Sequence, residues 1–426
     1  MILYYLLVLT LPMVAHPLLE RTFGGITVEK YLGLACLLFA ICTIPIRGTF
    51  PNFFKTPQAK TFVVLYLLLG YSYFTKGVVI APIEAYLIYT SHFVFLITTL
   101  LLVDNLDRLR WACLAAVGSV GIAALYVLRD YQSGSTVYGP GYRPGYVTGD
   151  PNYYTATAIL CLPVAIQFAQ EKQRPTWQRV FCLGVLLVAL GGVMVASSRG
   201  GFLGMVMAAL VYIWKSPKRL RNLVLIASVV TIFTVVGRHG ERGTSPLDRL
   251  LNPGQSDVQS QNVRLGLWQG GLAMVRENPL WGIGLGTFKE RIPQYAPPGF
   301  DIQFLAHNTY LEIAAEAGIP AMLVFTGLFV FTWINLAQTR RAAKKSGAVF
   351  LYQLAGSIQA GTAGFAVAVF FISAQFLKMF WFMLFISCCL PKILAKAIQE
   401  KQEQTVSATP TITWMEPKPG RFVSRP

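Results

Sequence analysis

Long apolar runs are the sequence feature that most constrains how this chain can fold. A membrane-spanning helix needs about 20 consecutive apolar residues, and such runs recur along the 426 residues. Only 13% of the residues are charged, about half the share in soluble domains, and the mean hydropathy is +0.52. We therefore expect an all-α, polytopic membrane bundle of about twelve transmembrane helices. The predicted spans are 2–18, 26–44, 61–77, 84–103, 110–128, 152–170, 179–197, 200–214, 221–237, 320–338, 349–373 and 376–394.

Basic residues predict the orientation of the bundle. Lys and Arg gather in alternate short loops, most densely at 215–221 and 340–345. The positive-inside rule then places these loops and both termini in the cytoplasm. The first run lacks a basic leader and a small-residue cleavage site, so we expect a retained span there. The net charge of +17 reflects this topology. It does not indicate a nucleic-acid partner, since no basic stripe alternates with stacking aromatic residues.

These patterns divide the chain into four parts. Residues 1–236 hold spans one to nine, 237–319 form a long periplasmic loop, and 320–395 hold spans ten to twelve. Residues 396–426 are polar and contain Pro and Thr, which predicts a disordered cytoplasmic tail. All seven cysteines lie in apolar runs without metal-ligand spacing, so we interpret them as small buried hydrophobic residues.

The loop 237–319 is the longest break between apolar runs. A loop of this length is usually functional or disordered, and its Trp, Leu, Ile and Gly content argues against disorder. Helical spacing over 262–277 predicts an amphipathic helix at the membrane surface, with Arg264 in its first turn. His307 opens a second helix that ends near 318–320. We expect a partly helical cap that brings Arg264 and His307 to one site.

Glycines within this loop are spaced as in a phosphate-binding loop. They lie at 282, 284 and 286, but no strand precedes them. The pattern is therefore weak evidence for nucleotide binding.

Two apolar runs meet almost without a loop at Ser197–Gly201. An arginine near membrane depth is costly unless it faces a partner or water. A serine-capped helix N-terminus beside the guanidinium of Arg199 suits a phosphate, and Gly200 and Gly201 permit close backbone approach. We predict an anion site here. The alternative is an arginine whose head reaches the interface from a short loop.

A turn rich in Gly and Pro precedes the run that begins near residue 152. Asp150 is placed to cap that helix, with Pro151 in its first position. The turn is either a simple capping loop or a wall of the outer cavity that offers Arg143 to a ligand, and both interpretations stay open.

Three motifs in this order resemble the bacterial O-antigen ligase and polymerase superfamily, a group similar to the GT-C glycosyltransferases that use lipid-linked sugars. They are Ser197–Gly201, Arg264–Trp268 with the glycine-rich turn, and His307–Leu311. The segment 149–154 also resembles a branch associated with exopolysaccharide clusters. The resemblance covers about a third of the chain and implies an all-α membrane enzyme of the bacterial inner membrane, with its site on the periplasmic face.

The resemblance implies transfer of a glycan from undecaprenyl diphosphate to an acceptor hydroxyl. In ligases the acceptor is the lipid A core, in polymerases another repeat unit, and in protein O-oligosaccharyltransferases a side-chain hydroxyl. We expect a ligase-like enzyme, with the other two activities as alternatives. Its partners would be the lipid-linked donor, a lipid or glycan acceptor and membrane lipids, without nucleic acid.

The same resemblance implies roles for individual residues. Arg199 and Arg264 would neutralise the departing diphosphate, and His307 matches the family position of the base. An imidazole with an ordinary pKa near 6.5 accepts a proton at neutral pH. No Asp-x-Asp or His/Asp cluster lies outside the membrane runs, so we expect neither a metal nor another cofactor. The expected substrate-binding residues are Ser198, Gly200, Gly201, Arg143, Asn308 and Tyr310.

Two other classes of function were weighed. A transporter or flippase would need charged or broken helices near the bilayer midplane and usually paired halves, whereas the predicted spans are nearly free of acids. A non-catalytic scaffold for polysaccharide assembly would tolerate the loss of Arg199 and His307.

Overall fold

The computed structural model describes residues 1–13, 16–20, 22–23, 26–44, 55–138, 142–145, 149–215, 223 and 255–408. Within these ranges the fold is helical, apart from one antiparallel pair of two-residue strands, β1 (Thr22–Phe23) and β2 (Ile26–Thr27). The helices are α1 (Ile2–Thr10), α2 (Pro17–Glu20), α3 (Val28–Cys42), α5 (Pro57–Ser72), the π-helical η1 (Tyr73–Gly77), α6 (Glu84–Leu102), α7 (Leu106–Tyr138), α8 (Pro151–Gln170), α9 (Thr176–Ala196), α10 (Arg199–Lys215), α13 (Gln255–Glu277), α14 (Phe288–Tyr295), α15 (Thr309–Ser346), α16 (Val349–Ala368) and α17 (Lys378–Ala408).

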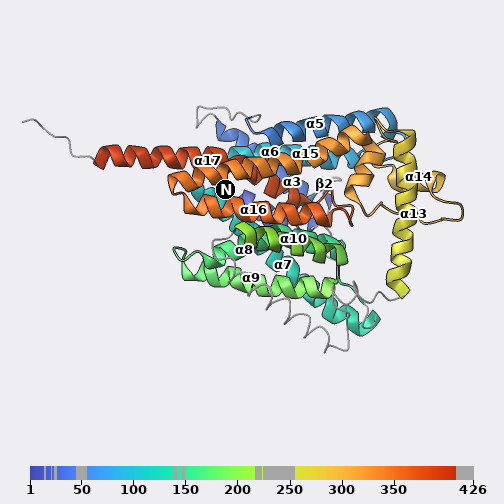
Figure 1. The fold of residues 1–426 in the computed structure, drawn as a ribbon, viewed down its shortest axis with the longest axis horizontal. Helices are drawn as coiled ribbons and strands as arrows, with labels where there is room; N and C mark the ends of the chain where they lie inside the picture. Colours follow the sequence, from blue (N-terminus) through green and yellow to red (C-terminus); the bar gives the residue numbers. More distant parts are fainter. Residues whose placement is uncertain are drawn as a thin grey trace, which may run out of the picture.

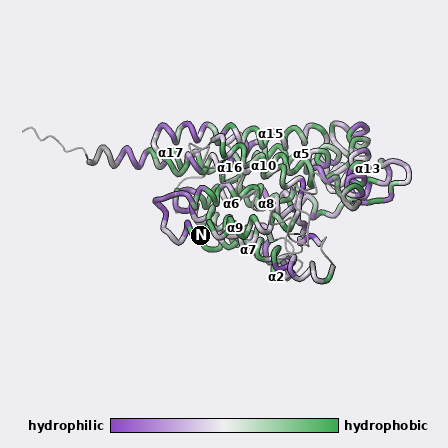
Figure 2. The backbone as a smooth tube through the Cα atoms, turned by 60° about the horizontal axis from the view of Figure 1, so that its bottom comes forward, coloured by the Kyte–Doolittle hydropathy of each residue, from purple (hydrophilic) through white to green (hydrophobic). Residues whose placement is uncertain are grey.

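The long helices run side by side along the long axis of the molecule, and α13 lies across one end of them (Figure 1). Apolar residues dominate the helices, while hydrophilic segments gather toward the two ends of the bundle (Figure 2). Five described helices are long and apolar enough to cross a membrane: α6, most of α7, α9, α15 and most of α17. The structure thus supports a polytopic membrane bundle, and it does not establish the expected number of about twelve spans.

Small residues allow the central helices to pack closely. A Cβ atom on Gly204 of α10 would lie 2.7 Å from the carbonyl oxygen of Gly364 on α16, and one on Gly364 would lie 2.4 Å from the carbonyl oxygen of Gly204. Close contact through glycines is a common way of joining helices in membranes, where the hydrophobic effect between helices is absent. Large apolar side chains such as Leu67, Leu187 and Leu323 point outward instead, as expected for surfaces in contact with lipid.

The first predicted span, 2–18, is wrong as a continuous helix. Helix α1 ends at Thr10 and α2 begins at Pro17, because Pro12 cannot continue a helix and Pro17 suits the first position of a new one. Apart from Leu223, the predicted span 221–237 lies outside the described residues.

The C-terminal helix continues beyond the boundary predicted for a disordered tail at residue 396. Helix α17 reaches Ala408. Its extension carries an i,i+4 ion pair between Lys396 and Glu400 at 3.9 Å and a hydrogen bond between Gln399 and Glu403 at 2.9 Å, and such pairs stabilise an exposed helix. Residues 409–426 lie outside the described part of the chain.

A break near residues 318–320 was expected, and the backbone does leave the helix there. Gly318 has φ 89° and ψ 167°, and the helix resumes at once through Pro320, so α15 consists of two helical pieces joined at a kink. Positive φ of this kind is tolerated by glycine and costly for other residues.

Candidate active site

The junction between α9 and α10 is capped by its serines. Ser197 adopts a left-handed conformation, with φ 46°, and ends α9. The buried Ser198 accepts a 3.1 Å hydrogen bond from the N–H of Gly201 and donates a 2.7 Å bond to Oδ1 of Asn152. The predicted serine cap is therefore confirmed for Ser198. Arg199, the first residue of α10, is half-buried beside it.

Arg143 ties this junction to the start of α8. Its Nε donates to the carbonyl oxygen of Ala196 at 3.0 Å, and its Nη2 donates to Oδ1 of Asn152 at 3.2 Å. Oδ1 of Asp150 accepts the N–H of Asn152 at 2.6 Å, which confirms the predicted cap of α8. These hydrogen bonds support the interpretation of the turn before α8 as a capping loop. Arg143 holds the end of α9 against the beginning of α8.

Gly200 and Gly201 do permit close approach, but protein side chains make it. A Cβ atom on Gly200 would lie 2.5 Å from Cβ of Phe371, and one on Gly201 would lie 2.3 Å from Cγ2 of Thr155. Both positions are buried. These glycines let α10 pack against α8 and the α16–α17 turn, and the geometry does not leave their faces open to a substrate.

His307 lies in a strained turn immediately before α15. Its φ of 52° is in the left-handed region, which is uncommon for a residue other than glycine and often marks a functional position. The imidazole stacks on Phe304, with centroids 5.1 Å apart. Burial and the charge of Arg264 lower the pKa of His307 to about 4, opposed in part by the carboxylate of Asp150. Arg264 and Asp150 thus lie close enough to His307 to act on it electrostatically.

Helix α13, which carries Arg264, is fixed by its apolar face. Leu267 and Met274 are buried in a cluster with Phe288 and Ile292 of α14. The predicted helix is present as part of α13, and its apolar face packs on the rest of the cap, while its position at the membrane surface stays a prediction. Trp268 anchors the helix further through a 2.9 Å hydrogen bond from its Nε1 to the carbonyl oxygen of Ala306.

Asn308 and Tyr310 are both engaged by the protein. Oδ1 of Asn308 accepts the N–H of Leu311 at 3.1 Å and so caps α15. The hydroxyl of Tyr310 donates to the carbonyl oxygen of Ala366 on α16 at 2.8 Å. Both side chains therefore position the start of α15, close to His307.

The turn between α16 and α17 belongs to the same region, although no sequence motif pointed to it. Oγ of Ser373 and Nε2 of Gln375 both donate to the buried carboxylate of Glu312, the latter at 2.6 Å. The hydroxyl of Tyr153 on α8 donates to the carbonyl oxygen of Ser373 at 2.9 Å. The N–H of Thr309 donates to two carbonyl oxygens of the turn. The turn thus links α8 to the start of α15.

The glycine-rich turn 278–286 is a packing element, and its glycines contact protein. Lys76 donates from Nζ to the carbonyl oxygen of Gly282 at 2.8 Å and to Oδ1 of Asn278 at 2.9 Å. A Cβ atom on Gly318 would lie 2.1 Å from the carbonyl oxygen of Leu280. The turn therefore packs closely around the kink of α15. This packing explains the glycines of the turn without a bound nucleotide.

The start of α8 connects the α9–α10 junction with the turn at His307. Asp150 acts electrostatically on His307, and two residues later Asn152 bonds Ser198 and Arg143. The end of the bundle where α8, α10 and α15 begin thus collects the predicted arginines, the histidine and their supports.

Comparison with known families agrees with this geometry. Residues 184–326 match the family model described as O-antigen ligase, a segment that runs from α9 into α15 and includes Arg199, Arg264 and His307 but not Arg143. A search of curated proteins found no match. The segment 184–326 is an O-antigen ligase family domain, and the protein that carries this domain is an enzyme of lipid-linked glycan transfer.

Proposed function

We propose that this enzyme transfers a glycan from undecaprenyl diphosphate to an acceptor hydroxyl, as an O-antigen ligase does, at the end of the bundle where α8 and α15 begin. The observation that carries the proposal is the strained turn of His307 at the entry to α15, where the imidazole stacks on Phe304 within electrostatic reach of Arg264 and Asp150. The junction that carries Arg199 is tied to the same end of α8 through Asn152.

Arg199 and Arg264 are proposed to bind the diphosphate. Negative charge grows on the diphosphate oxygens as the bond to the sugar breaks, and guanidinium groups match these oxygens with paired N–H donors. Donors fixed in place before the reaction are worth about 3 kcal/mol each in comparable sites. Both arginines lie on rigid helices, α10 and α13, which keeps such donors in place.

His307 is proposed to orient the acceptor hydroxyl and to take its proton. With a pKa of about 4, the imidazole is neutral across the physiological range and has a free lone pair, but it is a weaker base than an ordinary histidine. A bound diphosphate would offset the charge of Arg264 and thereby raise the pKa of His307 toward neutrality. In this proposal the donor substrate activates the base that serves the acceptor.

The site is proposed to face the periplasm of a bacterial inner membrane, with both termini in the cytoplasm. The distribution of Lys and Arg supports this orientation. The long apolar carrier would lie against the outer apolar surface of the bundle, with its diphosphate at the interface. We expect the reaction to need neither a metal nor another cofactor.

Deletion of the gene in its host, followed by gel analysis of surface polysaccharide, tests the function. A ligase predicts that polymer accumulates on the carrier and is not attached to the lipid A core. Loss of long chains with single units still attached would indicate a polymerase instead. Loss of a glycan from protein, with unchanged lipopolysaccharide, would indicate a protein O-oligosaccharyltransferase. Unchanged surface glycan would contradict all three.

A further inference from the structure

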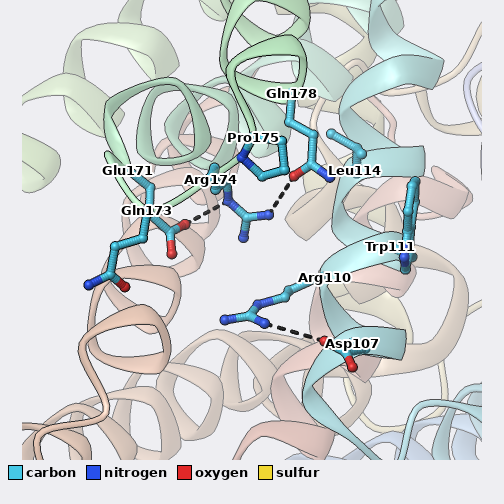
Figure 3. A pocket seen from close by; sticks show the side chains of 9 residues that line it. All are labelled: Asp107, Arg110, Trp111, Leu114, Glu171, Gln173, Arg174, Pro175 and Gln178. Atoms are coloured by element: carbon cyan, nitrogen blue, oxygen red, sulfur yellow. Dashed lines mark hydrogen bonds and ion pairs between the residues drawn. The ribbon is translucent and has the colours of Figure 1, made fainter.

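A cavity of about 270 Å³ lies at the other end of the bundle. Its lining comes from the start of α7, the turn after α8 and the start of α9 (Figure 3). Helix α8 runs from the candidate active site to this cavity, and its length corresponds to about 30 Å at 1.5 Å per residue. The cavity is therefore separate from the transfer site, and the inference below does not depend on the proposed function.

Arg174 is the central side chain of this cavity. It is 93% buried, since its side chain keeps 7% exposure, and its Nε donates to Oε2 of Glu171 at 2.6 Å. Nη1 donates to Oε1 of Gln178 at 2.9 Å, whereas the buried Nη2 has no hydrogen-bond partner among the described residues. A buried charged donor without a partner is costly, which suggests that a ligand supplies the acceptor.

Arg110 faces Arg174 across the cavity (Figure 3). Its Nη1 pairs with Oδ1 of Asp107 at 3.3 Å, and its buried Nε has no hydrogen-bond partner in the part of the chain that the structure describes. The two guanidinium carbons lie 4.9 and 5.1 Å from the centre of the same ring, that of Phe350. Two cations held against one ring repel each other, and an anionic group between them would relieve that repulsion.

The lining also carries negative charge, which narrows the choice of ligand. Asp107 and Glu171 contribute two carboxylates beside the two guanidinium groups. A purely anionic ligand would meet these carboxylates unfavourably. A ligand that joins a phosphate to an ammonium group would satisfy both signs.

The surroundings fit a position at the membrane interface. Trp111 lines the cavity, and the centroid of its ring lies 6.3 Å from that of Trp177. Both tryptophans are exposed. Exposed tryptophans are typical of the level of lipid headgroups. Further along α9 from Trp177, an exposed apolar strip is formed by Val180, Leu183 and Leu187. Acyl chains can lie along this strip.

We propose that this cavity binds the headgroup of a zwitterionic phospholipid that carries a primary ammonium, as phosphatidylethanolamine does. Nη2 of Arg174 and Nε of Arg110 donate to the phosphate. The ammonium donates to the carboxylates of Asp107 and Glu171. The bound lipid holds the turn between α8 and α9 against α7.

Native mass spectrometry of the full-length protein in detergent tests this site. The wild type is titrated with phosphatidylethanolamine, phosphatidylcholine and phosphatidylglycerol of identical acyl chains, and with soluble glycerophosphoethanolamine. Arg110→Gln removes one donor to the phosphate, and Arg108→Gln is the matched control. Arg108 lies on the same helix and pairs with Asp104 at 2.9 Å with similar side-chain exposure, 32% against 36% for Arg110, but it does not line the cavity.

We expect the wild type and Arg108→Gln to bind one phosphatidylethanolamine with equal affinity, and Arg110→Gln to bind it roughly tenfold or more weakly, as the loss of a charge-assisted bond predicts. Phosphatidylcholine, which has no N–H donor, and phosphatidylglycerol should bind more weakly. Equal binding by Arg110→Gln would overturn the site, and equal binding of phosphatidylglycerol would overturn its zwitterionic character. Equally tight binding of glycerophosphoethanolamine would identify a soluble ligand and overturn the lipid.

Discussion

The α9–α10 junction and the turn at His307 lie at the same end of the bundle, yet they use polar residues differently. At the junction, Ser198 and Arg143 both donate to Oδ1 of Asn152, and Arg143 also donates to the carbonyl oxygen of Ala196. At the turn, His307 is held by an unusual backbone conformation and a ring stack, and Arg264 sets its electrostatic environment. The side chains of the junction thus hold helices together, whereas the turn carries the side chains that are proposed to perform the chemistry.

The largest effect should come from His307→Ala. This variant should abolish turnover and retain binding of the lipid-linked donor, because the arginines remain. Single-turnover transfer and donor binding should be measured on the same preparation, with Phe304→Leu as a control for loss of the ring stack. Substantial transfer by His307→Ala would remove this residue from the role of base.

Arg199→Ala and Arg264→Ala should each reduce transfer by roughly a hundredfold or more, since each removes a donor to the developing charge. Protein level and melting temperature should stay close to wild type. Purified variants assayed with the lipid-linked donor provide the measurement. Near-normal rates in either variant would show that the arginine has a structural role and does not bind the diphosphate.

Arg143 tests the role of the junction in holding the helices together. If its role is positioning, Arg143→Lys and Arg143→Gln should both lower the melting temperature and reduce transfer by about tenfold, because neither side chain can reproduce the two bonds to Ala196 and Asn152. A lysine that retains full activity while glutamine does not would show instead that the charge of Arg143 binds substrate.

The pH dependence should distinguish free from loaded enzyme. The pKa of about 4 for His307 predicts that kcat/KM stays level from pH 8 to pH 5 and falls as the pH approaches 4. The acid limb of kcat should lie at higher pH, because bound diphosphate raises the pKa. Coincident limbs in the two profiles would contradict activation of the base by the donor.

The same depressed pKa affects stability. Between its ordinary value near 6.5 and about 4, the folded state binds fewer protons at His307 than the unfolded state. This residue therefore favours folding fully above pH 6.5, and that contribution is lost as the pH falls toward 4. Melting temperatures of wild type and His307→Ala should be measured from pH 7.5 to 4.5. As the pH falls, the melting temperature of the wild type should decrease relative to that of His307→Ala.

The smallest effect is expected from a chelator. Transfer by purified enzyme should continue in EDTA, since the arginines are proposed to neutralise the diphosphate. Loss of activity that Mg²⁺ restores would refute a metal-free reaction.

Features encoded by neighbouring residues were predictable from the sequence. Asp150 and one of the two serines at 197 and 198 were expected as helix caps, and Asp150 and Ser198 each accept a backbone N–H group. The apolar face of α13 followed from its helical spacing. The partner of each cap lies two or three residues away, and the apolar spacing of α13 repeats within one helix, so local pattern was sufficient.

Features that depend on distant partners were not predictable. Lys76 bonds Gly282 across more than two hundred residues, and Ser373 and Gln375 are isolated polar residues near apolar runs that meet Glu312 only in the folded bundle. The spacing of glycines at 282–286 was ambiguous for the same reason. The packing role of this turn depends on the kink at Gly318, which lies on another element.

The most direct test of a single transfer site is a cryo-electron microscopy structure of the enzyme with undecaprenyl diphosphate bound. We predict that the diphosphate oxygens lie within hydrogen-bonding distance of the guanidinium groups of both Arg199 and Arg264, with the imidazole of His307 beside them. A diphosphate bound elsewhere, or contacted by only one of the two arginines, would contradict this prediction.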